Sequence, residues 1–291
     1  MINLKGVGVA MVTPFLEDKS IDFEGLKKLT HYLIDNGVNY LVVQGTTGES
    51  PTLTAEEKAA VLDTVIKANA GKLPIVYGIG GNNTMAVAEA LSSFNTPGVD
   101  AILSVSPYYN KPTQEGIYQH FKTLSKHSKL PIILYNVPGR TSSNMLPETV
   151  LRLANDCPNI VAVKEASGNL EQAMKIIENK PNNFYVVSGD DALTQPFVAL
   201  GGDGVISVIG NGLPALFSEM VAEGLADNTA KSRALHYKCY GLIDHLFSEG
   251  NPAGIKEVLA HYDICQNHVR LPLTNVSVET KGRIVEFLQN L

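Results

Sequence analysis

Residues 159–168 read NIVAVKEASG, and this stretch decides the fold class. Four consecutive apolar residues, 160–163, predict a short strand buried on both faces, and the run ends on Lys164. Strands that are apolar on both faces are typical of parallel sheets covered by helices on each side. The stretch therefore predicts an α/β protein with a parallel sheet.

Seven further runs of the same kind occur along the chain, separated by longer amphipathic stretches that predict helices. These runs are GVGVAMV (6–12), YLVVQ (40–44), PIVYGI (74–79), AILSVS (101–106), PIILYN (131–136), FYVVSG (184–189) and GVISV (204–208). Eight strand–helix units are the number that closes a TIM barrel. The competing open sheet usually carries a GxGxxG turn after its first strand, but here that turn reads TPFLEDKS (13–20). We therefore expect a (β/α)8 barrel.

The pattern changes after the eighth run. Four helical segments follow without strands between them, at 214–228, 230–250, 252–262 and 277–290. We predict a catalytic barrel over residues 1–224 and a C-terminal helical extension over residues 225–291. The length of 291 residues suits a barrel with such an appendage.

Composition excludes several classes of function. The net charge of −6 argues against nucleic-acid binding, which requires a basic face. The apolar N-terminal residues predict a strand rather than a signal peptide, and no apolar run reaches membrane-spanning length. The seven histidines form no HExxH or Cys/His cluster, so we expect neither a metal ion nor a cofactor. Three widely spaced cysteines, Cys157, Cys239 and Cys265, predict reduced thiols in a cytoplasmic protein.

Lys164 has two interpretations. A lysine at a strand end can extend its ammonium group to solvent or pair with a carboxylate such as Glu165. Alternatively, burial penalises the ammonium form, and a neutral amine can attack a ketone to form a Schiff base. The residues themselves leave both interpretations open, and the first is the more common for an arbitrary strand-end lysine.

Hydroxyl side chains gather at the predicted strand ends, which form the catalytic face of a barrel. Tyr135 lies at the end of the fifth strand, adjacent to the strand of Lys164, and Thr46 and Tyr109 are further hydroxyls that could carry protons for a Schiff base. A single tyrosine at a strand end is more often a packed aromatic residue. Arg140 is the one arginine in these turns, either a surface charge or a ligand for a carboxylate.

Six motifs occur in a characteristic order: GTTGES (45–50), PYYNKP (107–112), YNVPGRT (135–141), VKEASGN (163–169), SGDD (188–191) and GGDGVISV (201–208). Each is weak alone, but together they resemble the pyruvate-dependent class I aldolase/lyase family over essentially the whole chain. Within that family, the chain looks like the branch that condenses pyruvate with aspartate semialdehyde in lysine and diaminopimelate biosynthesis. The resemblance implies a homotetramer, a dimer of tight dimers.

The resemblance also implies roles for individual residues. Lys164 would form the Schiff base with pyruvate, and a triad of Tyr135, Thr46 and Tyr109 would relay protons, with Tyr109 reaching into the neighbouring subunit. The remaining roles concern substrate binding: Thr47 would hold the pyruvate carboxylate, Arg140 the carboxylate of the semialdehyde, and Gly189 and Ile206 would line the pocket.

Arg140 separates this branch from the alternative within the family. Sister enzymes that cleave N-acetylneuraminate or 2-keto-3-deoxy sugar acids generally lack an arginine in this loop, because they accommodate a long polyol there. An aldolase of that type, which releases pyruvate, is the alternative function. A binding-only barrel would require a broken proton relay.

Two departures from the family pattern matter. Lysine-inhibited relatives hold lysine with histidines and a glutamate, whereas this chain has Ala55, Lys58 and Ala86 at the matching positions; Ser50, Asn82 and Tyr108 are retained. An ammonium group at position 58 and a missing carboxylate at position 86 predict weak or no inhibition by lysine. The second departure is Gly254, where many relatives have proline, and it concerns the geometry of the C-terminal helices.

Overall fold

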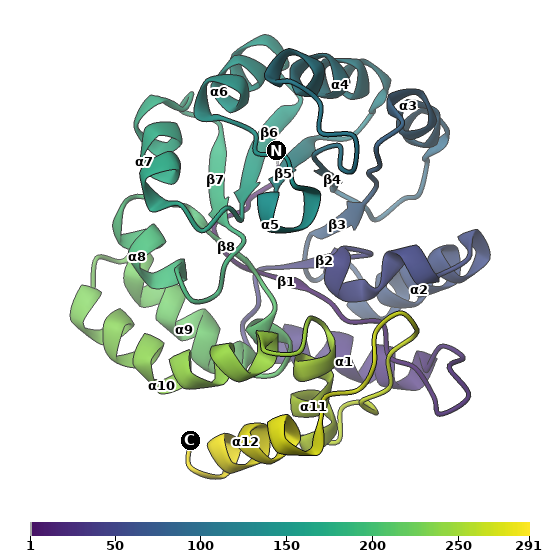
Figure 1. The fold of residues 1–291 in the computed structure, drawn as a ribbon, viewed down its shortest axis with the longest axis vertical. Coiled ribbons are helices and arrows are strands. Elements are labelled where there is room, and N and C mark those ends of the chain that lie inside the picture. The colour runs from purple at the N-terminus through teal and green to yellow at the C-terminus, as the bar shows by residue number, and fades with distance from the viewer. Residues whose placement is uncertain (1) are drawn as a thin grey trace.

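Eight parallel strands close into a barrel in chain order in the computed structural model, which describes residues 2–291 (Figure 1). The strands are β1 (Gly6–Ala10), β2 (Tyr40–Val43), β3 (Ile75–Gly78), β4 (Ala101–Val105), β5 (Ile132–Asn136), β6 (Ile160–Glu165), β7 (Tyr185–Ser188) and β8 (Gly204–Ser207). Strand β1 pairs with both β2 and β8, which closes the sheet. The predicted (β/α)8 fold is confirmed.

A ring of helices surrounds the barrel (Figure 1). These helices are α1 (Phe23–Asp35), α2 (Ala55–Asn69), α3 (Thr84–Ser93), α4 (Gln114–His127), α6 (Pro147–Asp156), α7 (Leu170–Asn179), α8 (Thr194–Ala199) and α9 (Pro214–Leu225). A single turn, α5 (Pro138–Thr141), lies in the loop after β5. A capping box begins α2: the Thr54 hydroxyl accepts from the Glu57 N–H, and the Glu57 carboxylate accepts from the Thr54 N–H.

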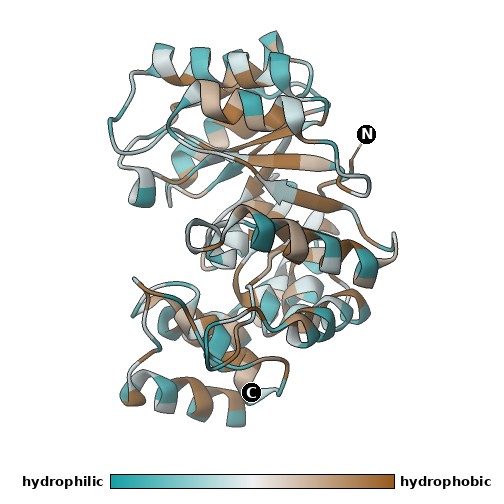
Figure 2. Ribbon diagram, turned by 90° about the vertical axis from the view of Figure 1, so that its right-hand side faces the viewer, coloured by the Kyte–Doolittle hydropathy of each residue, from teal (hydrophilic) through white to brown (hydrophobic). Residues whose placement is uncertain are grey.

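Strand alternation divides the apolar residues into two cores. One fills the barrel interior and the other lies between the barrel and its helices. On β5, for example, Ile133 and Tyr135 belong to the interior, whereas Ile132 and Leu134 belong to the outer layer. In Figure 2 the strands at the centre are mostly hydrophobic, and the surrounding helices carry both hydrophobic and hydrophilic residues.

The three cysteines are free and buried, as expected. Within residues 2–291, none of the helices combines the length and the hydrophobicity that crossing a membrane requires.

The C-terminal extension consists of α10 (Thr229–Phe247), α11 (Ala253–His261) and α12 (Val278–Gln289). It begins just after α9, which ends at Leu225, next to the predicted boundary. The structure explains why position 254 is glycine: a Cβ atom there would lie 2.4 Å from the backbone oxygen of Leu246. The end of α10 therefore packs against bare backbone at position 254, and a proline ring would not fit without a backbone shift.

A buried ion pair joins the extension to the loop after β2. Lys256 on α11 and Glu49 in that loop are both fully buried, and the Lys256 Nζ lies 2.6 Å from the Glu49 Oε1. Lys256 also donates to the carbonyl oxygen of His268, and the backbone N–H of Arg270 donates to Glu49 Oε2. Burial lowers the pKa of Lys256, and the Glu49 carboxylate opposes that lowering.

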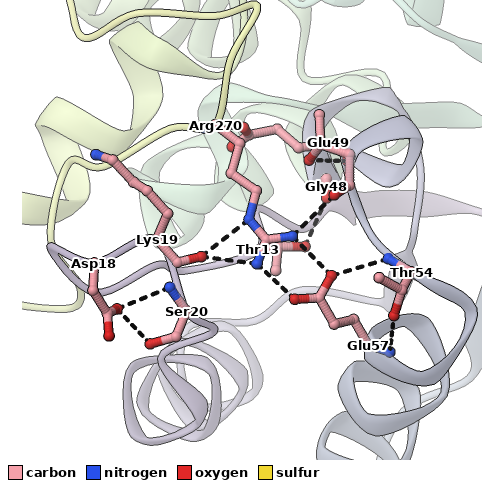
Figure 3. A network of polar contacts seen from close by, with 10 residues as sticks. Thr13, Asp18, Lys19, Ser20, Gly48, Glu49, Thr54, Glu57 and Arg270 are labelled. Carbon is pink, nitrogen blue, oxygen red and sulfur yellow. Dashed lines mark hydrogen bonds and ion pairs between the residues drawn. The ribbon is translucent and has the colours of Figure 1, made fainter.

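Arg270 makes a second connection to the same region (Figure 3). Its guanidinium group binds both carboxylate oxygens of Glu57 on α2, at 2.6 and 2.8 Å, and donates to the carbonyl oxygens of Thr52 and Lys19. Such a bidentate pair is stronger and more specific in geometry than a single contact. The extension is therefore attached to the first two strand–helix units of the barrel.

Replacing Lys256 with methionine should destabilise the protein by about 3 kcal/mol or more, because the Glu49 carboxylate would remain buried without its cation. Urea unfolding measures the loss. Lys67→Met is the matched control, since Lys67 pairs with Asp63 at the surface and such pairs contribute about 0.5 kcal/mol. Equal losses in the two variants would contradict a structural role for the buried pair.

Candidate active site

Lys164 lies at the end of β6 with its side chain inside the barrel. Its register neighbours are Tyr135 on β5 and Val187 on β7, and the side chain is 5% exposed. The Nζ atom lies 4.4 Å from the centroid of the Tyr135 ring. Within residues 2–291, this ammonium group has no ion-pair or hydrogen-bond partner. The Lys164 Nζ is therefore not held by a carboxylate, which leaves it available to bond to a carbonyl carbon.

Glu165, the next residue, lies on the opposite face of β6. Its carboxylate accepts hydrogen bonds from Asn136 Nδ2 at 3.0 Å, from Gln172 Nε2 at 2.9 Å and from the backbone N–H of Ser167 at 2.7 Å. These donors occupy the carboxylate on the helix side of the barrel. The interpretation of Lys164 as the partner of Glu165 is therefore wrong.

Gly189 and Ile206 surround Lys164 from the neighbouring strands. A Cβ atom at Gly189 would lie 2.9 Å from the Cε and 3.1 Å from the Cγ of Lys164, and 2.5 Å from the Cβ of Ala166. The lysine chain thus passes directly over the backbone at the end of β7. Ile206 on β8 is buried in the same interior core as Tyr135.

The one-turn helix η1 (Thr46–Gly48) after β2 carries both predicted threonines. Thr47 is buried, and its Oγ1 accepts a hydrogen bond of 2.9 Å from Asn251 Nδ2. Because this bond uses an acceptor site, the Thr47 hydroxyl hydrogen stays available to donate elsewhere. Asn251 lies in the extension, just before α11, and sequence reasoning did not identify it.

A cavity of about 870 Å³ opens at the carboxyl ends of the strands. Thr46, Tyr135 and Arg140 line it together, whereas Lys164 lies beside Tyr135 in the barrel interior and is not itself a lining residue. The charged residues along this cavity are Arg140 and Lys58, and no described carboxylate lines it. The cavity is therefore positive although the protein as a whole is acidic, which favours anionic ligands.

A sequence model of the Dihydrodipicolinate synthetase family matches residues 3–291. The chain belongs to this family.

Three relatives illustrate the similarity. The 4-hydroxy-tetrahydrodipicolinate synthase of Flavobacterium psychrophilum is 54% identical, with 98% of each chain covered. A solved dihydrodipicolinate synthase described as a monomeric variant is 40% identical, with a TM-score of 0.95 and coverage of 98% of this chain and 96% of that one. The enzyme of Cyanidioschyzon merolae, solved with lysine bound, is 39% identical, with a TM-score of 0.93 and coverage of 98% and 97%.

The structure does not bring the whole predicted relay of this family member together within one chain. Tyr109 is 87% exposed, adopts a φ of +76° and is absent from the cavity lining. Within residues 2–291, no hydrogen bond joins Tyr109, Tyr135 and Thr46. The relay therefore stays a prediction. Two of its three hydroxyl residues, Thr46 and Tyr135, line the cavity, and Tyr109 does not.

The two aspartates after β7 differ in their roles. Asp190 accepts hydrogen bonds from the N–H groups of Ala192 and Leu193 in the turn before α8, but no side chain caps that helix, whose N-cap residue is Leu193. Asp191 bonds to a different loop. It accepts instead from the N–H groups of Val208 and Ile209, and it thereby joins the loops after β7 and β8.

Gly189→Ala should lower kcat by about 100-fold, because the new methyl group would displace the Lys164 side chain from its position over β7. Steady-state kinetics with pyruvate measures the effect. Gly282→Ala on α12 is the control, since a Cβ atom there meets nothing within 4 Å. An unchanged kcat in Gly189→Ala would show that the lysine position is not critical.

Asp191 should make stability depend on pH. Burial raises the pKa of Asp191 from 3.8 to about 6, so the folded protein binds this proton more tightly than the unfolded chain. The contribution of Asp191 to the stability of the folded protein is most favourable below pH 4 and is lost as the pH rises through 6. We compare the free energy of unfolding of Asp191→Asn with that of the unmodified protein at each pH. This difference should favour the variant by about 2 kcal/mol more at pH 7.5 than at pH 4. Urea unfolding at both pH values tests this, and a difference independent of pH would contradict it.

Proposed function

We propose that the chain condenses pyruvate with L-aspartate 4-semialdehyde through a Schiff base on Lys164. The product is 4-hydroxy-tetrahydrodipicolinate, an intermediate of lysine and diaminopimelate biosynthesis. The observation that carries this proposal is the buried Lys164 ammonium group, which lies over the Tyr135 ring without an ion-pair partner in residues 2–291. Membership of the Dihydrodipicolinate synthetase family supports the same reaction.

The reaction begins when the neutral Lys164 amine adds to the keto carbon of pyruvate. Loss of water from this adduct gives an imine, and removal of a proton from the methyl group gives an enamine. The enamine carbon then attacks the aldehyde carbon, and the aldehyde oxygen takes up a proton. Finally, the amino group of the aldehyde substrate displaces Lys164 from the imine, which closes the six-membered ring and frees the lysine.

Each step moves a proton, and we assign Tyr135, whose ring lies beside the Lys164 Nζ, as the first group that carries it. We assign Thr46 and Tyr109 as the further members of the relay, with Tyr109 supplied by a neighbouring copy of the chain. The exposure of Tyr109 supports this, because its side chain extends away from its own subunit.

Substrate binding is assigned to the residues around these groups. Thr47, whose hydroxyl hydrogen is free to donate, would hold the pyruvate carboxylate. Arg140 at the cavity would bind the carboxylate of the semialdehyde. Gly189 and Ile206 would border the bound keto acid.

The assembly that we propose is a homotetramer built as a dimer of tight dimers. The assignment of Tyr109 to the site of a neighbouring copy requires at least the dimer. Sedimentation velocity measures this directly, and it is informative because one solved relative is described as monomeric. The three free, buried cysteines support a cytoplasmic location.

A coupled assay with pyruvate and aspartate semialdehyde tests the proposed reaction. Lys164→Ala should lose activity by about 1000-fold or more, because no other group can form the covalent intermediate. Lys129→Ala removes an exposed lysine and should retain activity. Equal activity in Lys164→Ala and the unmodified protein would refute the mechanism. Release of pyruvate from N-acetylneuraminate or a keto-deoxy sugar acid would favour the alternative aldolase.

Feedback by lysine should be weak or absent. Ala55 and Lys58 line the cavity where lysine-inhibited relatives have histidines, and Lys58 is a half-buried cation that repels an ammonium group. Asn82 is engaged by the Tyr108 carbonyl oxygen, at 3.2 Å. Titration of L-lysine into the coupled assay measures the effect, and half-inhibition at micromolar lysine would contradict the proposal.

A further inference from the structure

Gln44 is a buried amide that the proposed mechanism does not use. It follows β2 directly and precedes the loop with Thr46 and Thr47, and its side chain is 4% exposed. Neither its Oε1 nor its Nε2 has a hydrogen-bond partner within residues 2–291. Burying a polar amide without partners is unfavourable, so a residue of this kind at a site calls for a ligand that satisfies it.

The backbone at Gln44 adopts an unusual conformation that the neighbouring strand accommodates. Gln44 has a φ of +63°, in the left-handed region that non-glycine residues rarely adopt. On the neighbouring strand, a Cβ atom at Gly78 would lie 2.2 Å from the carbonyl oxygen of Gln44. Position 78 therefore has to be glycine for Gln44 to keep this conformation. Backbone strain of this kind persists where the surroundings enforce it, often at binding sites.

Gln44 lines the same cavity as Thr46, Tyr135 and Arg140. The aldehyde substrate has a carboxylate and an ammonium group on the same carbon. Arg140 supplies a partner for the carboxylate, but no described Asp or Glu lines the cavity to accept from the ammonium group. A carboxamide offers an acceptor and a donor side by side, which matches the two groups of an amino acid.

We propose that Gln44 is a specificity-determining residue that binds the amino-acid end of the aldehyde substrate. Its Oε1 accepts a hydrogen bond from the α-ammonium group, and its Nε2 donates to the adjacent carboxylate. This assignment rests on the proposed condensation reaction and adds to it the group that recognises the amine. It predicts that the enzyme distinguishes an amino aldehyde from the same aldehyde without its amine.

Gln44→Met tests the assignment, because methionine has a similar length and volume but no amide. We expect the KM for aspartate semialdehyde to rise by about tenfold or more, since a hydrogen bond to a charged group is lost. The KM for pyruvate should change by less than about twofold, because pyruvate binds to Lys164 before the aldehyde enters. Gln289→Met, on the exposed face of α12, is the control and should leave both values unchanged.

Succinate semialdehyde gives a second test that needs no variant. It has the aldehyde and the carboxylate of the substrate but lacks the ammonium group. Measured as a competitor of aspartate semialdehyde on the unmodified protein, it should bind about tenfold more weakly or worse. In Gln44→Met this difference should shrink.

Several outcomes would overturn the assignment. An unchanged KM for aspartate semialdehyde in folded Gln44→Met would do so, as would equal binding of the two aldehydes to the unmodified protein. A fall in kcat with unchanged KM values would also overturn it, because Gln44 would then position a relay hydroxyl instead of binding substrate. Failure of the condensation itself is distinguishable, since the unmodified protein would then show no turnover at all.

Discussion

Strand alternation within a closed barrel is the constraint on which the site depends. Successive residues of β6 point to opposite sides, so Lys164 enters the barrel interior and Glu165 faces the helices. The charged groups on the two sides of β6 have different surroundings. Three donors satisfy the Glu165 carboxylate, whereas Lys164 has the face of the Tyr135 ring and no carboxylate. A shift of one residue in the register would exchange these environments and place a carboxylate where the amine is needed.

The C-terminal extension completes the site from outside the barrel. The loop after β2 carries Thr46 and Thr47, and it is attached to α11 through the buried pair of Glu49 and Lys256. Asn251, at the start of the same segment, donates to Thr47 directly. The orientation of the Thr47 hydroxyl therefore depends on residues about two hundred positions away in the chain. This gives the extension a role in the site of its own subunit.

Local patterns predicted most of the fold. The eight apolar runs correspond to the eight strands, and the last three predicted helical segments form the extension. Chain order also predicted that Lys164 and Tyr135 would be neighbours, because consecutive strands of a barrel are adjacent and their carboxyl ends share one face.

Contacts between distant segments were not predictable in the same way. Asn251 binds Thr47 although the two residues are 204 positions apart in the chain, and no local pattern marks Asn251 as a site residue. Asp191 has the sequence context of a helix cap, but a contact with the loop after β8 takes precedence. The placement of Gln44 depends on a positive φ and on the missing side chain at Gly78, which only the folded chain reveals.

Among residues 2–291, two lysines are deeply buried, Lys164 and Lys256, and the proposed chemistry requires that they react differently. Reduction with borohydride in the presence of pyruvate, followed by peptide mapping by mass spectrometry, distinguishes them. The pyruvate adduct should appear on the peptide containing Lys164 and not on that containing Lys256, because Lys256 is held by Glu49 and the His268 carbonyl oxygen. An adduct on Lys256, or no adduct on Lys164, would contradict the assignment of Lys164 as the nucleophile.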